Sequence, residues 1–189
     1  MSQASEALEL ILRQPFAYLH AERGRLPALF AAPGPRAVLD QALLRGLGLS
    51  AEPLTLPAHS WAEAWVRHWR RLPAVARLMG AQLGWAQLAI GARLRELDQP
   101  TRSFARLGLG ERCASPICDT DGVLDTLDAM GLNALLAWHA HIPPALMQRL
   151  ILQFSPRVVA LQRAMPAQQP NESLFVLAVQ HARLHQNPD

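Results

Sequence analysis

The stretch CDTDGVLDTLDAMG, residues 118–131, separates two fold classes. Its carboxylates either form a nucleophile loop after a strand of an α/β sheet, or they begin a helix. Apolar residues recur at helical spacing from Val123 to Trp138. Carboxylates at a helix N-terminus accept hydrogen bonds from orphan N–H groups and complement the helix dipole. The stretch therefore predicts a helix whose N-cap is Asp119 or Asp121.

The alternative interpretation is a magnesium-dependent phosphatase. Asp119-Thr120-Asp121-Gly122 is similar to the start of the nucleophile loop in haloacid-dehalogenase-type phosphatases. That similarity implies attack on a phosphoryl group by Asp119 and proton transfer by Asp121. However, Pro116 would interrupt the strand that must precede such a loop. The 70 residues after Asp119 are also too few for the rest of a parallel sheet, so we expect the helix.

Proline, glycine and capping residues predict helices along the rest of the chain. Ser60 and Glu63 form a capping box, and Thr101 and Asn171 are expected N-caps. The pattern predicts an all-α protein, a compact irregular bundle of about seven to nine helices. We expect one domain over residues 1–189, with 1–112 and 113–189 as candidate sublobes. The expected helices span 6–14, 36–47, 61–72, 73–97, 101–108 and 123–138, restart at Pro144 and at Pro156, and end with 172–185.

Composition narrows the function classes. Half of the 189 residues are hydrophobic and 17% are charged, which is typical of a globular chain with a sizeable core. All 18 cations are arginine, which excludes chemistry that needs a lysine amine. The N-terminus lacks the features of a signal peptide. The longest uncharged run, residues 129–148, contains Asn133, two histidines and two prolines, so we expect no membrane insertion.

Metal and cofactor sites are not expected. Cys113 and Cys118 do not have a zinc spacing, and without an export signal they indicate reduced cytosolic thiols. His181 and His185 are four residues apart and share a helix face, but no matching acidic or histidine pair accompanies them. No catalytic set is recognisable, so we expect a protein that is not an enzyme.

Charge is distributed unevenly. Residues 67–112 carry nine arginines and three carboxylates, whereas residues 119–128 carry four aspartates and no cation. Such runs are either solvated faces, internally paired charges or surfaces for polar partners. The candidate partner-binding residues are Arg67, Arg70, Arg71, Arg93, Arg95, Arg102, Arg106, Asp119, Asp121, Asp125 and Asp128.

Three tryptophans form a stripe on one expected helix. Trp61, Trp65 and Trp69 follow one another at intervals of four residues, so they share a face. The stripe is either an aromatic core face or a binding surface, since tryptophan is enriched in interface hot spots. The sequence leaves both alternatives open.

Two segments resemble blocks of the SctK family of type III secretion accessory proteins. LRQPFAYLHAERGRLPALF, residues 12–30, resembles the N-terminal block, and GLNALLAWHAHIPPALMQRLILQFSP, residues 131–156, resembles a later block. The matching positions are Pro15, Tyr18, Leu19, His20, Leu26 and Pro27 in the first block, and Gly131, Trp138, Arg149, Leu150, Leu152 and Pro156 in the second.

The resemblance implies a cytoplasmic, helical, non-enzymatic adaptor without a cofactor. Such a protein would lie at the cytoplasmic face of the bacterial inner membrane, in the sorting platform of the injectisome. Its partners would be the cytoplasmic domain of the ring protein (SctD type) and the pod protein (SctQ type), and indirectly the stator and the ATPase. The alternatives are a helical nucleic-acid-binding regulator, the phosphatase that uses Asp119 and Asp121, and a secretion chaperone; a chaperone would normally be a small acidic α/β dimer.

Overall fold

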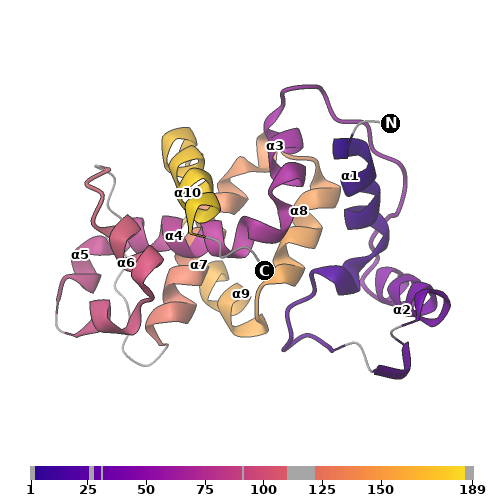
Figure 1. Cartoon of the computed structure of the whole chain (residues 1–189), viewed down its shortest axis with the longest axis horizontal. Coiled ribbons are helices and arrows are strands. Elements are labelled where there is room, and N and C mark those ends of the chain that lie inside the picture. The colour runs from indigo at the N-terminus through magenta and orange to yellow at the C-terminus, as the bar shows by residue number, and fades with distance from the viewer. Residues whose placement is uncertain (1–2, 26–27, 31, 91, 110–121, 186–189) are drawn as a thin grey trace. The chain divides into compact units, whose positions relative to one another are not determined.

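All regular structure that is described is helical (Figure 1). The computed structural model describes residues 3–25, 28–30, 32–90, 92–109 and 122–185. Within these ranges the chain forms ten α-helices and six short 3-10 helices, and no strand. The all-α prediction is therefore confirmed. The parallel sheet that a phosphatase of the alternative type requires has no counterpart in the described part of the chain.

The helices have the following bounds. The α-helices are α1 (Gln3–Arg13), α2 (Pro33–Gly46), α3 (Trp61–Arg67), α4 (Leu72–Leu83), α5 (Trp85–Leu88), α6 (Gln99–Ala105), α7 (Val123–Leu136), α8 (Pro144–Leu150), α9 (Pro156–Arg163) and α10 (Glu172–Leu184). The 3-10 helices are η1 (Pro15–Ala17), η2 (Ala28–Phe30), η3 (Trp69–Arg71), η4 (Arg93–Glu96), η5 (Ala137–Ala140) and η6 (Ile151–Gln153).

These helices gather into two compact units, each built from two separate stretches of the chain. Unit 1 contains residues 1–70 and 139–156. Unit 2 contains residues 71–138 and 157–189. Each unit therefore depends on contacts between segments that are far apart in sequence.

Unit 2 is built around the pairing of α4 with α7, its most extensive helix contact. The two backbones touch at glycines. A Cβ atom on Gly80 would collide with the carbonyl of Leu127, and one on Gly131 would collide with the carbonyl of Ala76. Only a residue without a side chain permits this approach, so the two glycines set the distance between the helices.

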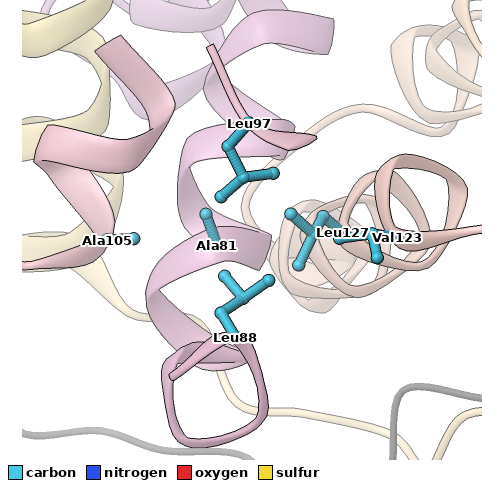
Figure 2. Close-up of a cluster of buried hydrophobic side chains, with 6 residues drawn as sticks. All are labelled: Ala81, Leu88, Leu97, Ala105, Val123 and Leu127. Carbon is cyan, nitrogen blue, oxygen red and sulfur yellow. The ribbon is translucent and has the colours of Figure 1, made fainter. Parts of the chain in front are cut away.

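A cluster of aliphatic side chains extends this core towards α5, η4 and α6 (Figure 2). Leu88, Leu97 and Leu127 converge around Ala81 in Figure 2, and all are at most 2% exposed. Trp85 and Leu94 pack against the cluster while remaining partly exposed. Burial of apolar surface at about 25 cal/mol per Å² is the main term that holds such short helices in place.

The tryptophan stripe contributes mainly to the core of unit 1. Trp65 is 0% exposed and Trp69 is 4% exposed, whereas Trp61 is partly exposed. The ring of Tyr18 meets that of Trp69 edge to face, at a centroid distance of 5.4 Å and an interplanar angle of 87°. Of the two interpretations of the stripe, the aromatic core face therefore holds for Trp65 and Trp69.

Several helix ends agree with the sequence, because their caps are local. The hydroxyl of Ser60 accepts a hydrogen bond from the backbone N–H of Glu63 at 3.2 Å. Glu63 reaches back, as predicted, although it accepts from the N–H of His59. Asn171 accepts from the N–H of Leu174 at 2.8 Å and caps α10.

Other helix boundaries differ from the prediction. The expected helix 61–72 ends as α3 at Arg67 and continues as η3. The expected helix 73–97 is interrupted at Gly84, which ends α4 and precedes α5. Glycine favours such an interruption because its helix propensity is low, and the break lets α5 turn its Leu88 into the cluster. Asp98, and not Thr101, caps α6, accepting from the N–H of Thr101 at 2.9 Å.

The N-cap position of α7 is Gly122, with a φ angle of 78°. No side chain caps this helix end among the described residues. Asp119 and Asp121, the predicted caps, lie outside the described residues.

The substitution Gly131→Ala should destabilise the protein. The new Cβ would meet the Ala76 carbonyl, so α4 and α7 must separate, at a cost of about 1 to 3 kcal/mol. Gly46→Ala is the matched control, because nothing lies within 4 Å of a Cβ at that position. Urea unfolding should show a lower midpoint for Gly131→Ala and an unchanged or slightly higher one for the control. Equal midpoints for both variants would contradict the close-packing argument.

Candidate functional site

The two blocks that resemble the SctK family meet in unit 1 at a buried guanidinium. Arg149, on α8, is 0% exposed. Its Nη2 donates to the carbonyls of Leu12 at 2.9 Å and of Ser50 at 2.7 Å, and its Nη1 donates to that of Ala145 at 3.0 Å. Leu12 belongs to the last turn of α1, whose carbonyl groups form the negative end of the helix dipole. Arg149 therefore caps α1 from a position 137 residues away.

Tyr18 satisfies another carbonyl at the same end of α1. Its hydroxyl donates to the carbonyl of Ile11 at 2.8 Å. Burial raises the pKa of Tyr18 well above its ordinary value, although the nearby Arg149 cation acts in the opposite direction. Burial likewise lowers the pKa of Arg149, but an arginine stays protonated at physiological pH. The pair is therefore a cation and a neutral phenol that together satisfy carbonyls of α1.

Two further hydrogen bonds join the blocks. The backbone N–H of His20 donates to the carbonyl of Leu152 at 2.9 Å, and Nε of Arg23 donates to the carbonyl of Phe154 at 2.7 Å. The buried family-like positions of this region are Pro15, Arg149, Leu150 and Leu152, whereas Tyr18, Leu19 and His20 are partly exposed.

The remaining family-like positions are distributed differently. Gly131 and Trp138 belong to unit 2, where Trp138 is 0% exposed and packs against Phe175. Pro156 begins α9. Leu26 and Pro27 lie outside the described residues.

Asp40 is a buried carboxylate of unit 1. It is 2% exposed and accepts from the N–H of Phe16 at 3.0 Å, with Nε of Arg36 at 3.8 Å. Burial raises the pKa of Asp40, and both contacts oppose that rise. A hollow of about 620 Å³ opens beside it, lined also by Arg13 and Leu44. Because Asp40 bonds to η1 from α2, its role is to fix α2 in place.

The acidic stretch is partly neutralised inside unit 2. Nε and Nη2 of Arg77 donate to the two carboxylate oxygens of Asp128 at 2.9 and 2.7 Å, in the two-pronged geometry that arginine favours. This pair raises the pKa of Arg77. Arg157 lies 3.3 Å from Asp125. Asp119 and Asp121 lie outside the described residues.

The predicted basic region is divided between the two units. Arg67 and Arg70 belong to unit 1 and are exposed, and Arg67 pairs with Glu63 at 3.2 Å. Arg71 begins unit 2 and is partly buried. The remaining predicted arginines of unit 2 lie on or beside η4 and α6: Arg93 and Arg102, which are partly buried, and Arg95 and Arg106, which are exposed.

His181 joins α10 to α6. Its Nε2 lies 2.9 Å from the carbonyl of Pro100 and 3.3 Å from the hydroxyl of Ser103. Because a carbonyl only accepts hydrogen bonds, Nε2 carries the proton. Burial lowers the pKa of His181, and the adjacent His185, whose ring centroid is 4.3 Å away, lowers it further. Within the described residues, no group of three His, Cys, Asp or Glu side chains is placed to hold a metal ion.

Sequence reasoning did not single out Arg77 and Arg157 as the partners of the acidic stretch. No local pattern marks this pair, because Arg77 lies on α4 and Asp128 lies 51 residues later on α7.

Comparison with known proteins supports one assignment. The family described as "Bacterial type III secretion apparatus protein (OrgA_MxiK)" matches residues 8–184. The oxygen-regulated invasion protein OrgA of Salmonella typhimurium strain LT2 is 28% identical over 178 residues, covering 94% of this chain and 87% of the relative. The OrgA proteins of strains SL1344 and 14028s match equally. No solved structure matches.

The helical fold and the extent of this match define a component of a protein secretion apparatus. The chain belongs to the OrgA/MxiK family of bacterial type III secretion apparatus proteins, which is the SctK family. The resemblance of the two sequence blocks is thereby confirmed. As a component of the apparatus, the protein has its partners within the secretion system. In the described part of the chain, no helix is long and apolar enough to cross a membrane.

Replacing Arg149 should lower the free energy of unfolding of the protein. In Arg149→Met the carbonyls of Leu12 and Ser50 lose their donor in a buried site, which should cost about 2 to 4 kcal/mol. Arg149→Lys should also destabilise, because one ammonium cannot reproduce the guanidinium fork. Arg163→Met, at an exposed position, is the control. Urea unfolding measures all three, and an Arg149→Met midpoint equal to that of the control would refute the capping role.

Stability should decrease as the pH falls through the titration of His181. The folded protein holds the pKa of His181 below its ordinary value of 6.5. Between the two values the unfolded chain binds more protons than the folded one, so acid favours unfolding. Above pH 6.5 the stabilisation is complete, and it is lost as the pH falls to the lowered folded pKa.

The measurement compares wild type with His181→Gln, whose amide can still donate to the Pro100 carbonyl. Urea unfolding at about pH 7.5 and about pH 5.5 should show a larger loss for wild type than for the variant. An identical loss in both proteins would show that another group controls the pH dependence.

Proposed function

We propose that this protein is a non-enzymatic adaptor in the sorting platform of the type III secretion injectisome. It links the cytoplasmic domain of the inner-membrane ring protein (SctD type) to the pod protein (SctQ type). Through the pod protein it is connected indirectly to the stator and the ATPase. The observation that carries this proposal is the family match over residues 8–184, which spans both units.

The contacts of the two units support a docking role. Both units have cores that consist largely of buried aliphatic and aromatic side chains. Several charged groups are used to hold the fold together, such as Arg149 and the Arg77–Asp128 pair. Exposed arginines remain on unit 1 at Arg70 and on unit 2 at Arg95 and Arg106. Rigid scaffolds with charged surfaces suit repeated docking, in which each contact is modest and many copies act together.

The adaptor would act in the cytoplasm at the inner face of the inner membrane. No helix of the described residues is suited to span a bilayer, so attachment would come through the ring protein. The pod protein would then be held at the membrane through a series of protein–protein contacts. Multiple copies around the ring would raise the overall affinity without requiring any single tight interface.

Purified protein should form complexes with both proposed partners from the same secretion system. Mixed at about 50 µM, it should shift the mass of the pod protein and, separately, of the ring protein's cytoplasmic domain. The mass is measured by light scattering after size exclusion. The destabilised Gly131→Ala variant tests whether binding depends on the folded state. A folded wild-type sample that binds neither partner would overturn the adaptor function while leaving the family assignment intact.

A further inference from the structure

Four arginines of unit 2 lie on or directly after the consecutive elements η4 and α6. They are Arg93 and Arg95 on η4, Arg102 on α6 and Arg106 just after α6. We refer to these four residues as the arginine corner. Arg95 and Arg106 are exposed. Within the described residues, no ion pair involves Arg95, Arg102 or Arg106.

The two carboxylates of the same segment offset this charge only in part. The carboxylate of Asp98 accepts from the N–H of Thr101 and caps α6, so it is oriented towards the helix end. Glu96 is exposed at the end of η4. Residues 92–109 thus carry four arginines and two carboxylates in sequence.

The corner is held on a rigid support. Leu97, directly after η4, is 2% exposed, and Ala105 at the end of α6 is 1% exposed. Both belong to the aliphatic cluster in Figure 2. Nη2 of Arg102 donates to the carbonyl of Leu97 at 2.7 Å, which restricts that side chain. Binding residues on fixed elements lose less conformational entropy when a partner docks.

Exposed apolar side chains accompany the arginines. Ile90, three residues before Arg93, is 67% exposed, and Leu107, directly after Arg106, is 44% exposed. Large apolar groups beside arginines are typical of protein–protein contact surfaces. A nucleic acid backbone would gain little from these apolar groups.

We propose that the arginine corner is the docking surface for an acidic segment of a partner protein, one that carries Asp or Glu side chains together with apolar residues. The proposal deepens the adaptor function and rests on it for the source of that partner. Carboxylates of the segment pair with Arg95 and Arg106, whose exposed guanidinium groups form two-pronged hydrogen bonds with carboxylates. Apolar residues of the segment contact Ile90 and Leu107.

Existing ion pairs also favour the corner over Arg67 and over the acidic stretch. Arg67 already pairs with Glu63. In the acidic stretch, Asp128 is held by both prongs of Arg77, and Asp125 pairs with Arg157. Docking at those positions would have to break existing pairs, whereas docking at Arg95 and Arg106 would not.

The test reverses the two exposed charges in Arg95→Glu/Arg106→Glu. The matched control is Arg163→Glu/Arg183→Glu, which changes the net charge equally at two other exposed positions of unit 2. Circular dichroism checks that both variants fold. If the reversal prevents folding, Arg95→Gln/Arg106→Gln replaces it.

Calorimetric titration with the pod protein and with the ring protein's cytoplasmic domain provides the first readout. The corner variant should bind one of them at least about tenfold more weakly than wild type, with a shallower dependence on salt. The control variant should bind like wild type. Unchanged binding by the corner variant, or an equal loss in the control, would overturn the proposal.

A second readout separates this proposal from the adaptor function. A synthetic peptide of alternating glutamate and leucine is compared with one in which glutamine replaces glutamate, and with a DNA duplex. If wild type binds neither natural partner, the adaptor function fails, and the peptide decides about the corner. If wild type and the control variant bind the glutamate peptide and the corner variant does not, the result supports the arginine corner as the docking surface. The proposal would be overturned if wild type did not bind this peptide. It would also be overturned if wild type bound the duplex more tightly than the peptide and the corner variant lost that binding.

Discussion

The burial of one guanidinium, that of Arg149, is the constraint on which unit 1 depends. A charge removed from water is costly unless its N–H groups find acceptors. Arg149 uses backbone carbonyls of α1, α8 and the segment at Ser50. The cation therefore faces the negative end of a helix dipole instead of a carboxylate. Because three parts of the chain supply these carbonyls, they must all be in place before the charge is accommodated, which makes the unit cooperative.

Unit 2 depends on a different constraint, the close approach of α4 and α7. Gly80 and Gly131 bring the backbones of α4 and α7 into direct contact, which removes the space that side chains would otherwise fill. The Arg77–Asp128 pair then fixes the register, since its two hydrogen bonds form only when the helices are correctly aligned along their axes. The arginine corner is supported by the cluster that surrounds this crossing, so a surface that we assign to binding depends on the same close approach.

Features that depend on neighbouring residues could be predicted from the sequence, and those that depend on tertiary contacts could not. Helical periodicity and the caps Ser60 and Asn171 involve residues within one turn, so the all-α class followed from them. The expected cap Thr101 is wrong for α6, because Asp98, three residues earlier, is the stronger capping residue and accepts from the N–H of Thr101. The pairing of the acidic stretch was hidden, since its partner Arg77 lies 51 residues away from Asp128. The arginines at the corner were predicted as candidates, but their place in a different unit from Arg67 and their support by the aliphatic cluster required the structure.

The interleaving of the two units has a consequence for synthesis on the ribosome. Unit 1 starts at the N-terminus but needs residues 139–156, and unit 2 needs residues 157–189. At about 5 to 20 residues per second, the first segment therefore waits for several seconds before its buried arginine is made. During that interval α1 can contact α3 but not α8, so part of the core of unit 1 is open to chaperones or to misassembly. A fragment that stops at residue 138 contains the complete chain of neither unit, and proteolytic nicks or premature termination should yield material that is cleared instead of a working half-protein.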